Sequence, residues 1–369
     1  MEPNINETPQ STDARNTAKE VVIVTGSSGL IGTQIIKRLT KNYRVIGLDK
    51  VGNPFPPVEA ECVCFDITSE ESIRAAMKRI CYGYGNKIAS VIHLAAYYDF
   101  SGKPSPLYEE VTVKGTEKFI KILQEFNVGQ FIFSSTNLIY KPTSPGTKIA
   151  EVCPLEPNWD YPESKVDTEE IIRKNRGNMP AVLLRLAGVY DDEGHSIPIA
   201  HQVQRIYEKQ FTSHFFSGDV SHGNVFLHLE DLVDGLEKTV ENRASLPEEV
   251  AINLGEPITP SYEELQNKIG KLIHGEEWET YEIPKTLAKI GSWSMNLFGD
   301  PFIKPWMIDR ADDHYELDIT RAKELLQWKP QHSLMDSLPK IIENLKSDPL
   351  TWYKKNKLDP PSELKKEMT

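Results

Sequence analysis

The chain has 369 residues, and its 42 basic and 54 acidic side chains give a formal net charge of -12. This balance works against a broad polyanion-binding surface, so we expect no nucleic-acid partner. No run approaches the roughly 20 apolar residues of a membrane span, and residues 1–19 lack the apolar core of a signal peptide. We therefore expect no membrane span and a cytoplasmic location. The four cysteines match no metal-ligand spacing, which predicts reduced thiols and no metal site.

Residues 1–19 are polar without apolar periodicity, so they are predicted to be a disordered tail. From Glu20 onward, short apolar runs alternate with amphipathic stretches. That alternation predicts an α/β fold with a doubly wound parallel sheet of the Rossmann type. The expected strands are Val21–Thr25, Tyr43–Leu48, Glu61–Phe65, Ala89–Leu94, Gln130–Ser134 and Ala181–Leu186, with helices near 30–41, 69–80, 107–126 and 161–175.

The pattern loosens after residue 190, which indicates a smaller, mostly helical substrate-binding part. Phe226–Leu229 and Ala251–Leu254 look like late strands that return to the sheet. The expected organisation is a dinucleotide-binding domain of residues 20–190 and 224–255, a substrate-binding part of residues 191–223 and 256–345, and a loose C-terminal tail of residues 346–369.

A glycine-rich turn follows the first expected strand, with Gly26, Gly29 and Gly32 at every third position. The first glycine permits a tight turn, the second lets the backbone approach a pyrophosphate, and the third lets the helix pack closely on the strand. The triplet alone also suits a turn without a ligand, but its place between a buried strand and a helix favours a dinucleotide. The candidate contacts are Gly26, Ser28, Gly29, Leu30, Ile31 and Gly32.

Asp49 ends the second expected strand, close to the spacing of about 20 residues at which an acidic residue follows such a turn. Its carboxylate can accept hydrogen bonds from ribose hydroxyls and would repel a 2′-phosphate, so NAD is favoured over NADP. Lys50 follows directly and softens this preference. The alternative for Asp49 is a solvated carboxylate at a strand end.

Tyr161 and Lys165 are four residues apart in an expected helix, which puts them on one face, about 6 Å apart along the axis. An ammonium beside a phenol favours the phenolate, so we expect the Tyr161 pKa to be lowered by about two units. Such a tyrosine can act as a general acid or base. Taken alone, a pair of this kind is more often a surface contact.

Three hydroxyls, Ser134, Ser135 and Thr136, end a buried strand. Ligands bind at the carboxyl ends of strands in open α/β sheets, so a hydroxyl there can hold the substrate oxygen whose proton Tyr161 moves. For Ser134 and Ser135, capping of the next turn is the alternative.

These motifs together resemble the extended short-chain dehydrogenase/reductases, also called the NAD-dependent epimerase/dehydratase family. The resemblance covers roughly residues 20–345. Further matches are Asp66-Ile67, His93-Leu94-Ala95-Ala96, Leu184-Arg185, His228 to Leu232 and the closing stretch from Asp318 to Pro330.

The resemblance implies a role for each matching residue. Thr136 would orient the substrate, Tyr161 would transfer a proton, and Lys165 would also bind the nicotinamide ribose. Asp66 and Ile67 would contact adenine. The other candidates for cofactor contact are Leu94, Ala95, Ala96, Ser134, Tyr161 and Lys165.

Three departures from the family pattern bear on the substrate. Thr112 replaces an asparagine that is usual in the helix after the fourth strand. Thr136 is followed by Asn137 rather than the Asp-Glu of nucleotide-sugar dehydratases, which makes dehydration doubtful. Ala187-Gly188 stands where nucleotide-sugar epimerases commonly carry an asparagine, which weakens that substrate class without excluding it.

The leading hypothesis is an NAD-dependent oxidoreductase or epimerase that moves a hydride between a substrate carbinol or ketone carbon and nicotinamide, with Tyr161 as general acid/base. One alternative is a nucleotide-sugar 4-epimerase, and another is an NAD(H)-sensing regulatory protein. The expected partner is a small-molecule substrate. By resemblance, a homodimer through the helices near 107–126 and 161–175 is possible.

Overall fold

The computed structural model describes residues 19–50, 60–99, 102–289, 305–362 and 364. The predicted disordered tail at residues 1–19 lies almost entirely outside the described residues. Within the described residues, no helix combines the length and the apolar composition that a membrane crossing requires.

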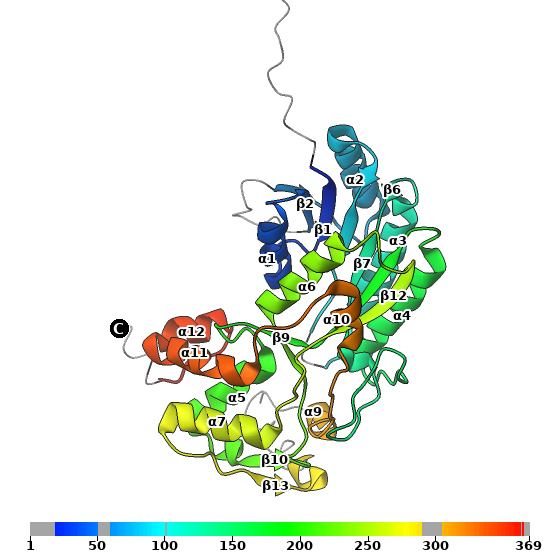
Figure 1. Ribbon diagram of the computed structural model, residues 1–369. Helices are drawn as coiled ribbons and strands as arrows, with labels where there is room; N and C mark the ends of the chain where they lie inside the picture. The colour runs from blue at the N-terminus through cyan, green and yellow to red at the C-terminus, as the bar shows by residue number, and fades with distance from the viewer. Residues whose placement is uncertain (1–18, 51–59, 100–101, 290–304, 363, 365–369) are drawn as a thin grey trace, which may run out of the picture.

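A seven-stranded parallel sheet forms the upper part of the molecule, in the order β12-β8-β7-β5-β1-β2-β3 (Figure 1). Its strands are short runs rich in Val, Ile, Leu and Phe, and those of the middle are buried on both faces, as crossover helices require. This confirms the doubly wound α/β prediction. The strands are β1 (Val21–Thr25), β2 (Arg44–Asp49), β3 (Glu61–Cys64), β5 (Ser90–His93), β7 (Phe131–Thr136), β8 (Ala181–Leu186) and β12 (Glu249–Leu254).

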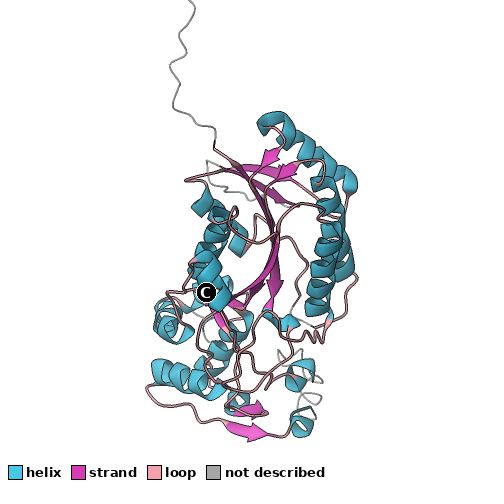
Figure 2. Ribbon diagram, turned by 45° about the vertical axis from the view of Figure 1, so that its right-hand side comes forward, coloured by secondary structure: helices cyan, strands magenta, loops and turns pink. Residues whose placement is uncertain are grey.

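Helices cover both faces of the sheet, which Figure 2 shows nearly edge-on. On one face lie α1 (Leu30–Leu39) and α6 (Leu229–Glu241), which pack against each other, with α10 (Thr320–Leu326) beside β12. On the other face lie α2 (Glu70–Tyr84), α3 (Lys114–Leu123) and α4 (Asp160–Asn175). Each face therefore has its own hydrophobic core.

The single helix expected over 107–126 is divided. It begins as a π-helix, η1 (Tyr108–Val113), and continues as α3. A π-turn widens the backbone by one residue and is frequent at functional sites. Here it lies beside α4, the helix that carries Tyr161 and Lys165.

One strand prediction is wrong. Ala251–Leu254 joins the sheet as part of β12, but Phe226–Leu229 does not: β11 (Phe226–His228) pairs with β9 (Gly188–Tyr190) in a separate two-stranded sheet. The chain leaves the main sheet at the carboxyl end of β8 and continues directly into β9. β11 pairs with β9 there and not with a strand of the main sheet. A short apolar run does not reveal which strand it will pair with.

The lower part of the molecule packs α5 (Ile197–Tyr207), α7 (Tyr262–His274), α11 (Leu334–Ser347) and α12 (Pro349–Lys355) around a third core. The remaining elements are short. They are β4 (Lys87–Ile88), β6 (Asn127–Val128), η2 (Asn137–Ile139), η3 (Phe211–His214), β10 (Phe215–Ser217), β13 (Tyr281–Ile283) and α9 (Pro305–Asp309).

The prediction of a loose tail after residue 345 is wrong for residues 346–358. Trp352 and Tyr353 of α12 are 1% and 0% exposed within the third core, and the Tyr353 hydroxyl donates to Glu208 Oε1 at 2.7 Å. Two aromatic side chains bury enough apolar surface to hold a short polar helix in place. The proposed division between the two parts stays a prediction.

Candidate active site

The glycine-rich turn joins β1 to α1, and its backbone leaves no room for a side chain at Gly26 or Gly32. A Cβ on Gly32 would lie 2.2 Å from the Gly26 carbonyl oxygen, and one on Gly26, whose φ is +68°, would lie 2.9 Å from Ala95 N. No side chain caps α1 at Gly29, and its first turn holds no acidic residue. A helix N-terminus without a side-chain cap at its N-cap residue suits a diphosphate. The turn therefore fits a dinucleotide.

Asp49 lies at the end of β2, next to this turn. Its Oδ2 accepts from Ser28 N at 2.9 Å and its Oδ1 from Lys50 N at 2.7 Å. Each carboxylate oxygen keeps a second lone pair for a ribose hydroxyl, and the fixed negative charge disfavours a 2′-phosphate. Lys50 is turned to Asp66, with Nζ 3.2 Å from Oδ2. Because this ion pair engages the Lys50 ammonium, it reduces the expected effect of Lys50 on the preference for NAD over NADP.

Asp66 and Ile67 follow β3. The Asp66 carboxylate accepts from the hydroxyl of Thr68 at 2.7 Å and from Thr68 N at 3.0 Å, and these bonds lower its pKa. Ile67 is buried, and its side chain packs against Gly115 at the start of α3. Their predicted contact with adenine stays a prediction.

His93, Leu94, Ala95 and Ala96 run from the end of β5 past the turn. Ala95 N donates to Thr25 Oγ1 at 3.2 Å, and the fully buried His93 ring contacts that oxygen at 2.8 Å. Burial lowers the pKa of His93 to about 3, so the ring is neutral. His93 thus fixes the wall of the turn, while Leu94 to Ala96 remain candidates for the cofactor.

Tyr161 lies in the first turn of α4, next to Thr136 at the end of β7. Burial raises the pKa of Tyr161 to about 12, and a hydrogen bond with the Thr136 hydroxyl opposes this increase. The prediction of a lowered pKa is therefore wrong for the protein alone. The cost of desolvating the phenolate outweighs the attraction of Lys165, whose Nζ lies 5.7 Å from the ring centroid.

Lys165 is 3% exposed, and its Nζ donates to the Ser134 carbonyl oxygen at 2.7 Å. Burial lowers the pKa of Lys165 to about 7, against the influence of the Glu169 carboxylate. The Ser134 hydroxyl donates to His93 O at 3.2 Å. The structure thus brings Thr136, Tyr161 and Lys165 together, while the Ser134 side chain is engaged between β5 and β7.

Aromatic residues that the sequence did not single out surround the phenol of Tyr161. Its ring centroid lies 4.9 Å from that of Tyr98, 5.5 Å from Trp159 and 6.5 Å from Tyr108. The Tyr108 hydroxyl donates to Asp99 O at 3.0 Å, which ties η1 to the loop after β5. The only signal in the sequence was their density near the predicted motifs.

Thr112, the residue that departs from the family pattern, lies in η1. Its hydroxyl oxygen accepts from Tyr97 N at 3.0 Å, and its carbonyl accepts from the Thr116 hydroxyl at 2.6 Å. Thr112 therefore shapes the loop that carries Tyr98 toward Tyr161.

A buried ion pair lies behind the site, on the same face of α4. Glu169 and Arg185 are 0% and 3% exposed, and the guanidinium binds both carboxylate oxygens, with Nη2 to Oε2 at 2.8 Å and Nε to Oε1 at 3.1 Å. A charge in the buried strand β8 requires a partner. The sequence could therefore have indicated that Arg185 has an anionic partner, but it does not identify which acid that partner is.

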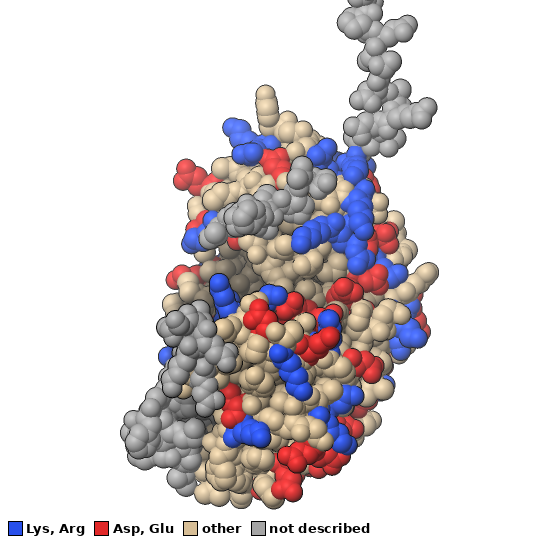
Figure 3. Space-filling view, turned by 90° about the vertical axis from the view of Figure 1, so that its left-hand side faces the viewer, with Lys and Arg blue, Asp and Glu red and all other residues tan. Residues whose placement is uncertain are grey.

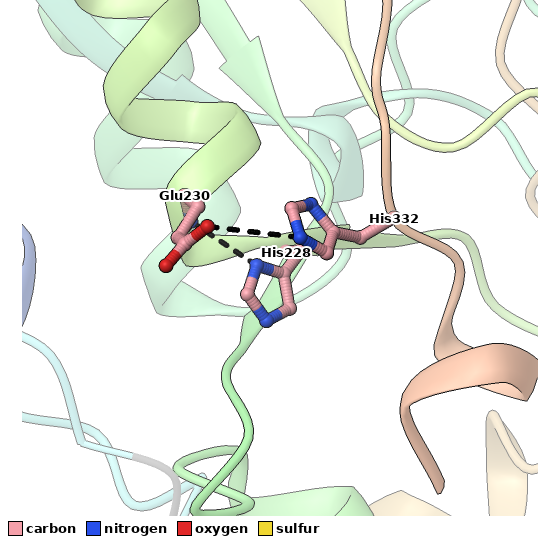
Figure 4. A group of neighbouring side chains, drawn as sticks. All are labelled: His228, Glu230 and His332. Atoms are coloured by element: carbon pink, nitrogen blue, oxygen red, sulfur yellow. Dashed lines mark hydrogen bonds and ion pairs between the residues drawn. The ribbon is translucent and has the colours of Figure 1, made fainter. Parts of the chain in front are cut away.

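A second cluster lies between the two parts of the molecule. Within the described residues, His228, Glu230 and His332 place one possible ligand atom each within 4.8 Å of one another (Figure 4). However, the two imidazole rings are stacked, with centroids 4.1 Å apart and planes 21° apart. Imidazole binds an ion in its own plane, so one ion cannot serve both rings in this arrangement. We assign no metal role to the cluster.

Comparison with known proteins agrees with this geometry. Residues 22–255 match the model of the NAD dependent epimerase/dehydratase family. The chain is 24% identical to UDP-glucose 4-epimerase of Vibrio cholerae over 338 residues, which cover 87% of this chain and 94% of that one. It is 26% identical to human 3 beta-hydroxysteroid dehydrogenase type 7 over 238 residues, 58% of this chain and 62% of that one.

Among solved structures, UDP-glucuronic acid 4-epimerase from Bacillus cereus in complex with NAD has the same fold, with a TM-score of 0.65 at 20% identity over 89% of this chain and 99% of that one. The family match spans the glycine turn, Thr136 and the Tyr161–Lys165 pair. The chain therefore belongs to the NAD-dependent epimerase/dehydratase family of extended short-chain dehydrogenase/reductases, and it is an NAD-dependent enzyme.

Proposed function

We propose that the enzyme oxidises and reduces a secondary alcohol carbon of a small-molecule substrate at the carboxyl ends of the central strands β1, β5 and β7. The observation that carries this proposal is the convergence of Thr136, Tyr161 and Lys165 beside a turn that fits a dinucleotide. When bound, NAD supplies the acceptor and donor of the hydride.

The residues of the chain handle the proton. Thr136 orients the substrate oxygen, and Tyr161 exchanges a proton with it. With a pKa near 12 in the protein alone, Tyr161 is a neutral phenol, ready to protonate the oxygen of a ketone as it is reduced. Oxidation of an alcohol first requires loss of the phenol proton, and the Lys165 ammonium favours that loss.

The substrate proposal starts from the relatives that align over most of the chain, which are named as UDP-sugar 4-epimerases. We propose epimerisation of a nucleotide-linked sugar: oxidation at a carbinol carbon, rotation of the bound ketone and reduction on its other face. The cycle returns NAD to its starting state, so no net NADH forms.

A second candidate is a net dehydrogenase for an alcohol without a nucleotide. Three aromatic rings, those of Tyr98, Tyr108 and Trp159, lie around Tyr161 and offer apolar contact area. Ala187 and Gly188 also lack the amide expected of a sugar-diphosphate site. These features favour a largely apolar substrate.

The test compares UDP-glucose, UDP-galactose and UDP-glucuronate with a steroid alcohol. NMR of the products detects epimerisation, and NADH absorbance detects net oxidation. Tyr161→Phe should reduce either activity by about a thousandfold. Tyr84→Phe makes the same chemical change on α2, where the hydroxyl donates to Glu61 Oε2 at 2.7 Å at the exposed surface, and should leave turnover unchanged. Retention of turnover within about tenfold by Tyr161→Phe would reject general acid/base work by this residue.

Several finer assignments also remain proposals. We propose the residues of the turn, together with Asp49, Asp66, Ile67, Leu94 to Ala96 and Ser134, as the NAD contacts. On the face shown in Figure 3, basic side chains gather at the upper right and lie among acidic ones below; the absence of a nucleic-acid partner stays a prediction from the net charge of -12. The homodimer through η1, α3 and α4 and the cytoplasmic location stay predictions.

A further inference from the structure

We propose that Glu169 is a positioning residue that keeps the Lys165 side chain protonated and holds α4 in register with the end of β7. This inference rests on the proposed function, because it assigns Lys165 a part in the proton transfer of Tyr161.

The spacing along α4 carries the first step. Tyr161, Lys165, Glu169 and Arg173 are each four residues apart, so they form a single ridge along the helix. The first two lie at the site, and the third is buried directly behind it. A carboxylate one turn from an ammonium stabilises the charged form of both groups.

The hydrogen bonds of Glu169 link α4 to the end of β7. Its Oε1 accepts from the Ser135 hydroxyl at 2.7 Å. Ser135 stands between Ser134, whose carbonyl binds Lys165, and Thr136, whose hydroxyl binds Tyr161. Glu169 is thus anchored to the strand segment whose two neighbours contact the catalytic side chains, and it fixes the helix against that segment.

The groups around Lys165 carry the third step. On α4, Tyr161 and Glu169 face Lys165. On β5, the neutral ring of His93 faces it. The titratable group that η1 adds here is Tyr108, which acts on Tyr161. The cations nearest to Glu169 are Arg185 from β8 and Arg173. Glu169 is therefore the one acid among the described residues that faces Lys165. The positive charges of Arg185 and Arg173 partly balance its negative charge.

Replacement of Glu169 has a definite consequence. Without the negative charge of Glu169, the buried ammonium of Lys165 loses the one acid that faces it in the described part of the chain, while the cation of Arg185 remains. The pKa of Lys165, already lowered by burial, should fall further. If the ammonium supports turnover, the alkaline limb of the kcat profile should move to lower pH with it.

The experiment measures Lys165 without substrate. An NMR titration of the full-length protein, labelled at the lysine ε-carbons, follows Lys165, whose signal is identified by its loss in Lys165→Met. Glu169→Gln should lower the Lys165 pKa by about one unit and shift the alkaline limb of kcat equally. A purely structural role would lower kcat at every pH without this shift. An unchanged Lys165 pKa in the folded variant would overturn the proposal.

A second variant decides the matter if Glu169→Gln does not fold. Arg173→Gln removes a half-exposed cation from Glu169 Oε2, so the Lys165 pKa should rise slightly, opposite to the first variant. Arg74→Gln breaks an i,i+4 pair of the same type on α2 and should leave Lys165 unchanged. No rise with Arg173→Gln overturns the proposal. If the pKa values shift as expected but no alcohol, sugar or ketone is turned over, the assignment of Glu169 stands and the proposed function fails.

Discussion

Two buried polar regions of the molecule differ in how completely their polar groups are hydrogen-bonded. Behind α4, Glu169 receives hydrogen bonds from Ser135, Arg173 and Arg185 on both of its oxygens. Between the two parts of the molecule, Glu256 Oε1, His228 Nε2 and His332 Nδ1 are buried without a hydrogen bond. The two imidazole nitrogens lie within 3.4 Å and 3.2 Å of carboxylates without forming a hydrogen bond to them.

The contrast has a physical meaning. A saturated buried pair holds its side chains in one geometry, as the positions of Tyr161 and Lys165 require. An incompletely paired region carries a desolvation cost that changes with protonation. We therefore expect the first region to fail when a partner is removed and the second to respond to pH.

The largest effect should come from breaking the saturated pair. Arg185→Met leaves the carboxylate of Glu169 buried without its bidentate partner, and we expect a loss of about 3–5 kcal/mol in the free energy of unfolding. Urea denaturation measures this loss. Arg74→Met, which removes two exposed ion pairs, to Glu70 and to Glu125, serves as the control and should leave the midpoint nearly unchanged. Similar midpoints for both variants would remove the basis of the comparison.

The second effect has the opposite sign. Burial raises the pKa of Glu256 to about 7, so the folded protein keeps this proton at pH values where the unfolded chain has lost it. The associated stability is complete below the usual carboxyl pKa of about 4.5 and is lost as the pH rises through about 7.

Glu256→Gln removes this penalty and should stabilise the protein by about 2 kcal/mol near pH 8 and hardly at all near pH 4. Urea denaturation at the two pH values measures the difference. Glu263→Gln, an exposed change on α7, should show no dependence of this kind. Equal stabilisation at both pH values would contradict the assigned cause.

The smallest effect concerns Asp231 of α6, an acid that lies between the two parts of the molecule. Its two oxygens accept from Gln331 N at 3.0 Å and His332 N at 2.9 Å. Asp231→Asn keeps one acceptor, so we expect a loss of about 1 kcal/mol and faster hydrogen exchange at one of these amides. Glu230→Gln, at an exposed neighbour, should leave both amides protected. Unchanged exchange in Asp231→Asn would show that these bonds do not hold the segment between α10 and α11.

The sequence was informative where the signal is local. The turn at Gly26–Gly32, Asp49 and the Tyr161–Lys165 spacing depend on residues close in the chain, and the strands β1 to β8 of the sheet follow from apolar runs. The family assignment and NAD were accordingly predicted.

Properties that depend on distant partners were not predicted. Glu169 and Arg185 meet only after α4 packs on β8, and the same packing desolvates Tyr161 and reverses the expected direction of its pKa. Phe226–Leu229 looked like a strand of the main sheet because its pairing with β9 is a property of the whole fold. In the C-terminal stretch, polar composition concealed two buried aromatic residues.

The burial of α12 has a consequence for the order of synthesis. A ribosome releases the chain from its N-terminus, so all seven strands of the main sheet emerge before Trp352 and Tyr353 are made. Until then, the side of α11 against which α12 packs lacks its covering, and the third core is incomplete. We expect the unfinished chain to need a chaperone at this stage, which concerns its lower part and not its nucleotide-binding part.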